Sequence, residues 1–294
     1  MARNHFITLF VLAAIWGGSF LLIRVAVPAL GPVPLVIVRV ALAGLTLGLY
    51  AWATRHALGL WQRPGAFLIL GFLNAAAPFA LIAAAQLHIG PSMVAVLNAS
   101  TPLFTAIVAA VWLRDPMTLT KLAALLLGIA GVAVVVGGTP SIETTAQLLA
   151  CGMVVLASFF YGIGAVYTRT VMRGVTPLAM AAGQQLGAFV VLLPAVFVIA
   201  PQPTWSAPAL LAVVTLALAC TAFAYILYFR LIETAGPTFA NTVTLLVPVF
   251  GILWGSIFLG ESVSWALVLG LALVMSSVLA TSLPTGKRAR LAPK

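Results

Sequence analysis

The chain has 294 residues, of which 63% are hydrophobic and 6% charged, with a formal net charge of +10 and a mean hydropathy of +1.21. An ordinary globular chain carries about 25% charged residues, so this composition excludes a soluble globular enzyme and a disordered chain. The two cysteines exclude a disulfide-rich scaffold, and the basic residues are scattered between apolar runs instead of forming the patch that nucleic-acid binding needs. A polytopic membrane protein remains.

Apolar runs of about 20 residues, the length that crosses a bilayer as a helix, recur along the whole chain. They predict an all-α membrane protein with ten spans, at residues 6–28, 33–53, 65–87, 91–112, 119–137, 147–169, 178–200, 207–230, 238–259 and 264–283. The runs show no period of two, so they do not fit a β-barrel. The first run lacks a small-residue cleavage site after it, so we interpret it as a span and not as a removed signal peptide.

The basic residues predict the orientation, because short loops rich in Lys and Arg stay in the cytoplasm. Twelve of the 14 fall on one side of a ten-span arrangement: Arg3, Arg55, Arg63, Arg114, Lys121, Arg169, Arg173, Arg230, Lys287, Arg288, Arg290 and Lys294. Only Arg24 and Arg39 lie elsewhere, inside spans near the outer face. We therefore expect both termini in the cytoplasm; the basic tail could also touch anionic lipid.

The second half of the chain echoes the first at a nearly constant offset. Trp16-Gly17 corresponds to Tyr161-Gly162, and Gly90-Pro91 corresponds to Gly236-Pro237. Further matches are Arg24 with Arg169, Pro32 with Pro177, Pro102 with Pro248, Phe104 with Phe250, Leu113 with Leu259 and Asp115 with Glu261. Each repeat holds five spans, an odd number, so the halves must insert in opposite directions. The predicted division is a first repeat at 1–140, an inverted repeat at 141–283 and a basic cytoplasmic tail at 284–294.

Inverted repeats are typical of secondary transporters, in which two related halves exchange conformations around a central site. A duplication kept only for packing is the alternative. We expect a multi-pass protein of the cytoplasmic (inner) membrane, with membrane lipids and a small solute as partners. One chain holds both halves, so a monomer suffices.

The opening Ala14-Ile15-Trp16-Gly17-Gly18-Ser19-Phe20 resembles that of the EamA-type drug/metabolite transporter superfamily. The Gly90-Pro91 and Pro102-Leu103-Phe104 segments, with the later Pro248-Val249-Phe250 and Gly260-Glu261, resemble it too. The resemblance covers essentially the whole chain and is most similar to YddG-type amino-acid exporters. It implies ten helices around a central cavity and export of aromatic and other amino acids and related metabolites. It supplies no catalytic residues.

Polar residues inside spans need a partner, a backbone bond or a wet cavity. Those on corresponding helices of both halves are our candidates for the substrate pathway: Trp16, Ser19, Asn74, Pro78, Asn98, Thr101, Tyr161, Tyr225, Asn241 and Thr244. Each has a plainer alternative. Hydroxyls can bond back to their own helix, Asn74 and Asn98 can join helices, Trp16 and Tyr161 can fill the core, and Pro78 can be a tolerated kink.

The positions of the carboxylates predict whether transport is coupled to an ion gradient, because proton- or sodium-coupled carriers usually hold carboxylates in mid-membrane. The four acidic residues, Asp115, Glu143, Glu233 and Glu261, all lie in loops or at span ends. We therefore expect facilitative transport, with proton coupling at the rim as the alternative. Arg39 is the most deeply placed charge, and its long side chain can snorkel outward. Phosphorylated solutes need Arg or Lys, of which only Arg39 is available, so neutral or zwitterionic solutes fit better.

Two other classes of protein compete with this interpretation. A carrier for drugs, nucleosides or other metabolites would have the same composition. A membrane enzyme needs a metal-binding or nucleophile motif such as HExxH or GxSxG, and the sequence contains neither. We expect no cofactor and no metal, no nucleic-acid partner and no enzymatic activity.

Overall fold

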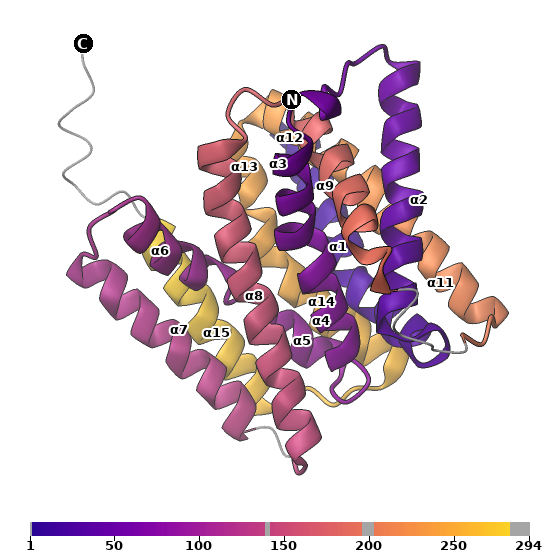
Figure 1. The fold of residues 1–294 in the computed structure, drawn as a ribbon. Helices are drawn as coiled ribbons and strands as arrows, with labels where there is room; N and C mark the ends of the chain where they lie inside the picture. The colour runs from indigo at the N-terminus through magenta and orange to yellow at the C-terminus, as the bar shows by residue number, and fades with distance from the viewer. Residues whose placement is uncertain (1, 139–141, 196–202, 283–294) are drawn as a thin grey trace.

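The structure is a computed structural model that describes residues 2–138, 142–195 and 203–282 (Figure 1). Every regular element in these ranges is helical. In the first half these are α1 (Ala2–Leu30), α2 (Pro32–Ala53), the 3₁₀ turn η1 (Leu60–Gln62), α3 (Pro64–Gly71), the π-helical turn η2 (Phe72–Ala76), α4 (Ala77–Ala85), α5 (Pro91–Asn98), α6 (Thr101–Trp112) and α7 (Leu119–Gly138). The second half has α8 (Thr145–Val171), α9 (Pro177–Leu192), α11 (Ala207–Ala217), the π-helical turn η3 (Leu218–Phe223), α12 (Ala224–Ala235), α13 (Pro237–Asn241), α14 (Val243–Leu259) and α15 (Trp265–Ser282).

Within the described ranges, eight helical segments are long and apolar enough to cross a membrane. They are Asn4–Leu30, Pro32–Ala53, Pro64–Ala85, Pro91–Trp112, Leu119–Gly138, Thr145–Val171, Ala207–Ala235 and Phe239–Leu259. The predicted spans 178–200 and 264–283 contain two shorter apolar helices, Pro177–Leu192 and Trp265–Ala280. Part of the first of these spans, 196–200, and the predicted tail 284–294 lie outside the described residues. The chain is thus an all-helical, multi-pass membrane protein.

Proline and glycine set several joints between helices. Pro32 and Pro237 stand in the first turn of α2 and α13, where the missing N–H has no helical partner to lose. The glycines before them, Gly31 and Gly236, have φ of 75° and 86°, a backbone region that favours glycine. Sharp turns therefore follow α1 and α12 without a long loop.

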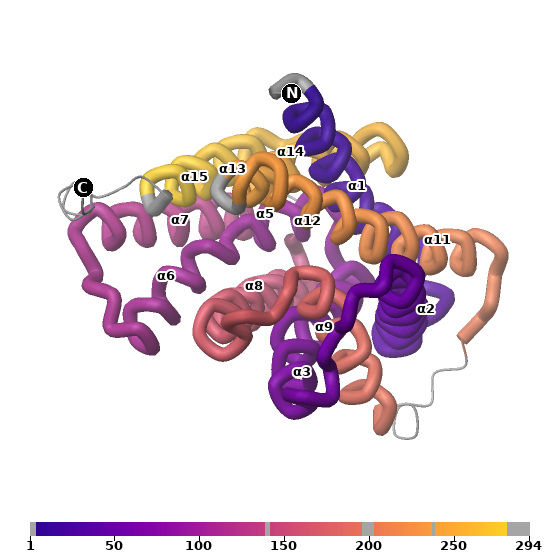
Figure 2. Tube along the Cα trace, turned by 90° about the horizontal axis from the view of Figure 1, so that it is seen from above, coloured from indigo at the N-terminus to yellow at the C-terminus, as the bar shows by residue number. Residues whose placement is uncertain are grey.

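The helices pack in two matching groups. Seen from above, α7 and α15 lie at one edge of the molecule and α2 and α11 at the opposite edge (Figure 2). Between these edges, α1 packs on α14 and α8 packs on α6. The helices α1 and α8 hold the equivalent pairs Trp16-Gly17 and Tyr161-Gly162, so equivalent helix contacts join the two halves twice.

Glycine permits both close contacts. A Cβ on Gly17 would lie 2.6 Å from Phe250 Cβ, and one on Gly162 would lie 2.9 Å from Phe104 Cβ. Phe104 and Phe250 are themselves an equivalent pair in the sequence. The repeat seen in the sequence is therefore a repeat of packing geometry.

The loops after α6 and α14 also correspond. Asp115 N donates to Ala109 O at 3.4 Å, and Glu261 N donates to Gly255 O at 3.2 Å. The residue before each carboxylate, Arg114 or Gly260, has a positive φ of 53° or 64°. Both helices thus end in the same left-handed turn, which places one carboxylate directly after the last turn of each helix.

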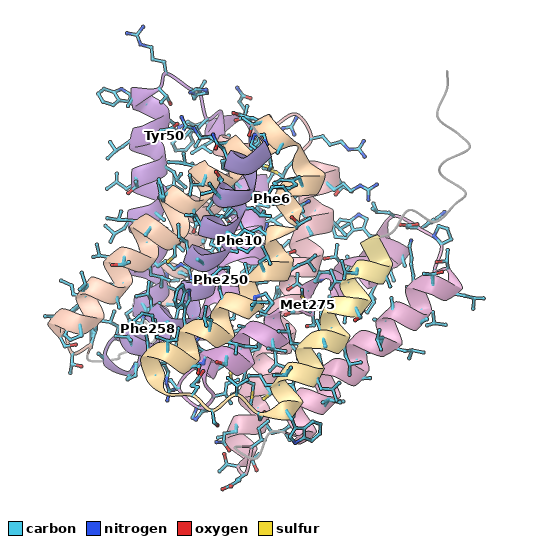
Figure 3. The ribbon with its side chains drawn as sticks, turned by 180° about the vertical axis from the view of Figure 1, so that it is seen from behind. Phe6, Phe10, Tyr50, Phe250, Phe258 and Met275 are labelled. Carbon is cyan, nitrogen blue, oxygen red and sulfur yellow. The ribbon has the colours of Figure 1, made fainter. Side chains whose placement is uncertain are left out.

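The outer surface is apolar. Phe6, Phe10, Tyr50 and Phe258 point away from the bundle and are exposed (Figure 3). A monomeric soluble protein rarely exposes so continuous an apolar surface, whereas a bilayer covers it. Lys121 Nζ, in the first turn of α7, forms a salt bridge at 2.9 Å with Asp115 Oδ1 in the preceding loop.

Candidate functional site

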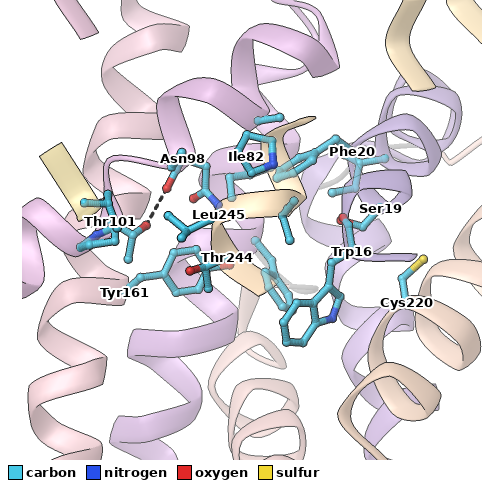
Figure 4. A pocket seen from close by; sticks show the side chains of 18 of the residues that line it. Trp16, Ser19, Phe20, Ile82, Asn98, Thr101, Tyr161, Cys220, Thr244 and Leu245 are labelled. Atoms are coloured by element: carbon cyan, nitrogen blue, oxygen red, sulfur yellow. Dashed lines mark hydrogen bonds between the residues drawn. The ribbon is translucent and has the colours of Figure 1, made fainter. Parts of the chain in front are cut away.

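A cavity of about 340 Å³ lies inside the bundle between helices of both halves. Seven of the ten predicted pathway residues line it: Trp16, Ser19, Asn98, Thr101, Tyr161, Tyr225 and Thr244 (Figure 4). They come from α1, from α5 and α6, and from α8, α12 and α14. Because these helices are equivalent in pairs, the cavity is built from corresponding parts of the two repeats.

Aromatic rings form one wall of the cavity. Trp16 meets the ring of Tyr225 edge-on, with centroids 6.1 Å apart, and the ring of Tyr228 at 5.4 Å. Gln184 Nε2 donates to the Tyr225 hydroxyl at 2.6 Å, which fixes the orientation of that ring. Phe20 from α1 and Phe79 from α4 extend the apolar lining. Such a wall suits a flat apolar group.

Three candidate hydroxyls donate hydrogen bonds to main-chain oxygens three residues earlier, which is the alternative role considered for them above. Ser19 Oγ donates to Trp16 O at 2.6 Å, and Thr101 Oγ1 donates to Asn98 O at 2.8 Å. Thr244 Oγ1 donates in the same way to Asn241 O at 2.8 Å. Their oxygens can still accept a hydrogen bond from a solute.

Asn98 stands where the fourth span is interrupted between α5 and α6. Its side-chain Oδ1 is buried and has no hydrogen-bond partner among the described residues. Its main-chain oxygen accepts from Thr101 and, at 3.5 Å, from Ser158 Oγ of α8. Interrupted helices at mid-membrane commonly line binding sites in transporters.

Three predicted residues lie away from the cavity. Asn74 sits in η2 against α8, where its Oδ1 occupies the space that a Cβ on Gly164 would need. Pro78 is buried in α4. Asn241 is exposed at the end of α13 and accepts a hydrogen bond from the Tyr228 hydroxyl. Their spacing predicted that they share a helix face with residues that line the cavity. In the bundle, the helices are rotated so that these three residues face other helices or the surface.

Arg39, the most deeply placed charge, faces the cavity. It does not snorkel to the surface: it is 6% exposed and lines the cavity. Its Nε donates to Thr221 Oγ1 at 3.1 Å, and its Cζ lies 3.7 Å from the centroid of the Phe79 ring. These two partners hold the guanidinium inside the bundle, so the passage does contain a cation.

The two π-helical turns explain part of this placement. In η2 the N–H of Ala77 bonds to Phe72 O, a wide turn directly before Pro78, which has no N–H to give. In the equivalent turn η3, Thr221 Oγ1 donates to Leu216 O at 2.9 Å and also accepts from Arg39. Position 75, equivalent to Thr221, is alanine, so no sequence symmetry pointed to this contact.

No side-chain carboxylate lines the cavity. In the described part of the chain, no three His, Cys, Asp or Glu side chains lie close enough together to hold a metal ion. The electrostatics of the site are therefore those of one arginine among aromatic, hydroxyl and amide groups.

Comparison with known proteins agrees with this architecture. The chain is 25% identical over 271 residues to "Uncharacterized transporter YvbV" of Bacillus subtilis, covering 91% of this chain and 88% of that protein. It is 28% identical over 282 residues to "Uncharacterized inner membrane transporter YedA" of Escherichia coli, covering 94% and 89%. "Protein PecM" of Dickeya dadantii is 24% identical over 279 residues, covering 92% and 89%.

A solved structure, titled only "Crystal structure of protein", shares the fold with a TM-score of 0.67 at 16% identity, covering 94% of this chain and 96% of that chain. The model of the EamA-like transporter family matches the chain twice, at residues 5–137 and 148–283. With both halves matched and an apolar helical bundle around a cavity, the chain belongs to the EamA-like transporter family.

Proposed function

We propose that this transporter exports amino acids, aromatic and other apolar or neutral ones, and related metabolites across the cytoplasmic membrane by alternating access. The cavity is the observation that carries the proposal. Its volume of about 340 Å³ lies at the lower end of the range of small-molecule sites, about 300–1,000 Å³. A solute of amino-acid size matches it better than a large drug does.

The chemistry of the lining supports the same class of solute. The Trp16 and Tyr225 rings offer an apolar wall for a side chain. The Tyr161 hydroxyl and the Asn98 amide, whose Oδ1 has no hydrogen-bond partner among the described residues, offer polar contacts. A binding site of this kind joins an apolar body to a few placed polar groups.

Inverted repeats support the alternating-access part of the proposal. The contact of α1 with α14 is equivalent to the contact of α8 with α6, so each takes the place of the other when the two halves swap conformations. Two arrangements of similar energy then exist, one open to each side of the membrane. Arg63 Nη1 donates to the main-chain oxygens of Val171 and Arg173, so two of the basic loops meet at one face, which we assign to the cytoplasm.

Transport is facilitative in this proposal, because all four side-chain carboxylates lie outside the cavity. One chain supplies both halves of the cavity, so the monomer is the transporting unit. The name of the Escherichia coli relative places that protein in the inner membrane, which agrees with the location that we propose here.

Purified full-length protein in liposomes tests the proposal. Labelled phenylalanine and tryptophan should exchange across the vesicle membrane without a proton gradient. Trp16→Ala should slow the exchange about tenfold, since it removes a ring contact worth about 0.5–1.5 kcal/mol beyond its buried area. Trp16→Phe keeps a ring and is the control.

Three results would contradict parts of the proposal. A sustained proton flux coupled to the solute would contradict facilitative transport. Vesicles that move a nucleoside or a drug but none of a panel of amino acids would contradict amino-acid export. An unchanged flux in Trp16→Ala would remove Trp16 from the site.

A further inference from the structure

We propose that the Arg39 guanidinium binds a carboxylate of the transported solute, so that the transporter selects amino acids and other carboxylates over the matching amines, esters and amides. The inference rests on the proposed function in taking the cavity as the solute site. It names the chemical group that the cavity recognises and the residue that recognises it.

Arg39 is a buried cation without an anionic partner. The chain has four acidic side chains, and the structure describes all of them: Asp115 pairs with Lys121, Glu261 binds Ser92, and Glu143 and Glu233 are exposed. None lies within ion-pair distance of Arg39. A buried charge is strongly unfavourable unless a counter-charge and hydrogen bonds compensate it.

The contacts that Arg39 does make are neutral and leave most of its donors unused. Nε donates to Thr221, and the Phe79 ring covers one face of the guanidinium. Among the described residues, neither terminal nitrogen donates a hydrogen bond. The planar fork is thus held rigidly by its inner nitrogen and by its face, with its outer edge unpaired, which is the edge that takes a carboxylate bidentately.

The neighbours of Arg39 fit the remainder of an amino acid. Tyr161, Tyr225 and Cys220 lie within electrostatic reach of the guanidinium and line the same cavity. A carboxylate on Arg39 would leave an apolar or aromatic side chain among these rings and Trp16. The single cation also disfavours cationic drugs, which would bring a second positive charge into a site without a carboxylate.

Arg24 is the matched comparison inside the same chain. It too lies within a membrane-spanning helix, but its Nη1 donates to the main-chain oxygen of Gln86, at the end of α4. It does not line the cavity. A cation near a helix C-terminus is favourably placed, so a terminal nitrogen of Arg24 has a structural partner, whereas those of Arg39 have none among the described residues.

The experiment uses proteoliposomes and labelled L-phenylalanine, with competitors that differ in one group. In the wild type, 3-phenylpropionate should compete, while phenylalanine methyl ester and 2-phenylethylamine should compete at least about tenfold more weakly, the usual effect of a charge-assisted hydrogen bond. Arg39→Gln should lower phenylalanine uptake by about tenfold to a hundredfold and abolish this discrimination. Arg39→Lys keeps a point charge but lacks the planar fork, so its uptake and its discrimination should lie between those of the wild type and Arg39→Gln. Arg24→Gln should keep the wild-type ranking.

A binding measurement separates this inference from the proposed function. In detergent, 3-phenylpropionate should raise the melting temperature of the wild type and 3-phenylpropanamide should not, with no shift for Arg39→Gln. If no amino acid is moved but this Arg39-dependent shift is present, amino-acid export fails and the carboxylate site stands. If amino acids are moved but amide and carboxylate behave alike in the wild type, the Arg39 inference is overturned. If Arg39→Gln does not fold, the order in which the wild type binds the carboxylate, ester, amine and amide still tests the inference.

Discussion

Equivalent stretches of the two repeats differ in their surroundings. In the first half, each residue of Pro91–Leu97 in α5 is buried, and Glu261 Oε2 accepts hydrogen bonds from both N and Oγ of Ser92. In the second half, Asn241, Thr242 and Thr244 of α13 and the start of α14 are exposed. Both stretches begin with the same Gly-Pro pair, but Asn241 and Thr242 stand where the first stretch has Ala95 and Val96.

The packing partners of the two stretches differ as well. The first stretch lies against α14, whose end carries Glu261, whereas α13 packs chiefly on α12 and the start of α14 and has no comparable contact with α6. The helix also breaks one turn earlier in the second half, at Thr242, than in the first, at Ala99 and Ser100. One mouth of the cavity is therefore closed and the other open. With the cytoplasmic placement of the basic loops that we propose, this conformation corresponds to the inward-open state of the proposed cycle.

The largest expected effect is a difference in chemical access between the two mouths. Thr244 and Ala95 both line the cavity, but Thr244 is exposed and Ala95 is 1% exposed. In a background with Cys151→Ala and Cys220→Ala, a membrane-impermeant thiol reagent added from the cytoplasmic face should modify Thr244→Cys about tenfold to a thousandfold faster than Ala95→Cys. This range corresponds to a minor open state populated at about 0.1–10%. Equal rates would contradict the closed mouth.

Loss of the carboxylate at the closed mouth should have the next largest effect. Glu261→Gln weakens charge-assisted hydrogen bonds to Ser92 that are worth about 1.5–3 kcal/mol. The closed mouth should then open more often, and labelling of Ala95→Cys from the outer face should rise about tenfold or more. If this rate stays unchanged, Glu261 does not hold the mouth closed.

The equivalent change at the other mouth should have the smallest effect. Asp115 pairs with Lys121 at 2.9 Å, with the two side chains 33% and 22% exposed, and such partly exposed pairs contribute about 0–1 kcal/mol. Asp115→Asn should therefore change the labelling rate of Ala95→Cys and the transport rate by less than about fivefold. If Asp115→Asn had an effect as large as that of Glu261→Gln, the two carboxylates would contribute equally to closing their mouths, which would contradict this comparison.

Much of the fold could be predicted from the sequence, because hydrophobic length and the Gly-Pro joints determine helices largely independently of one another. Eight of the predicted spans are candidate membrane helices, and the other two contain shorter ones. Seven of ten predicted pathway residues line one cavity. The rotation of a helix in the bundle could not be predicted from the sequence: Asn74 packs on Gly164, and Arg39 faces the cavity.

The sequence by itself determined the class of protein, the helices and the family, since these depend on composition, periodicity and motifs within single segments. It also determined that few charges could lie in the passage. Only the tertiary structure decided that Arg39 faces the cavity, because its partners Phe79 and Thr221 come from two other helices, one in each half. It alone decided which mouth is closed, because the helices packed across the two mouths differ.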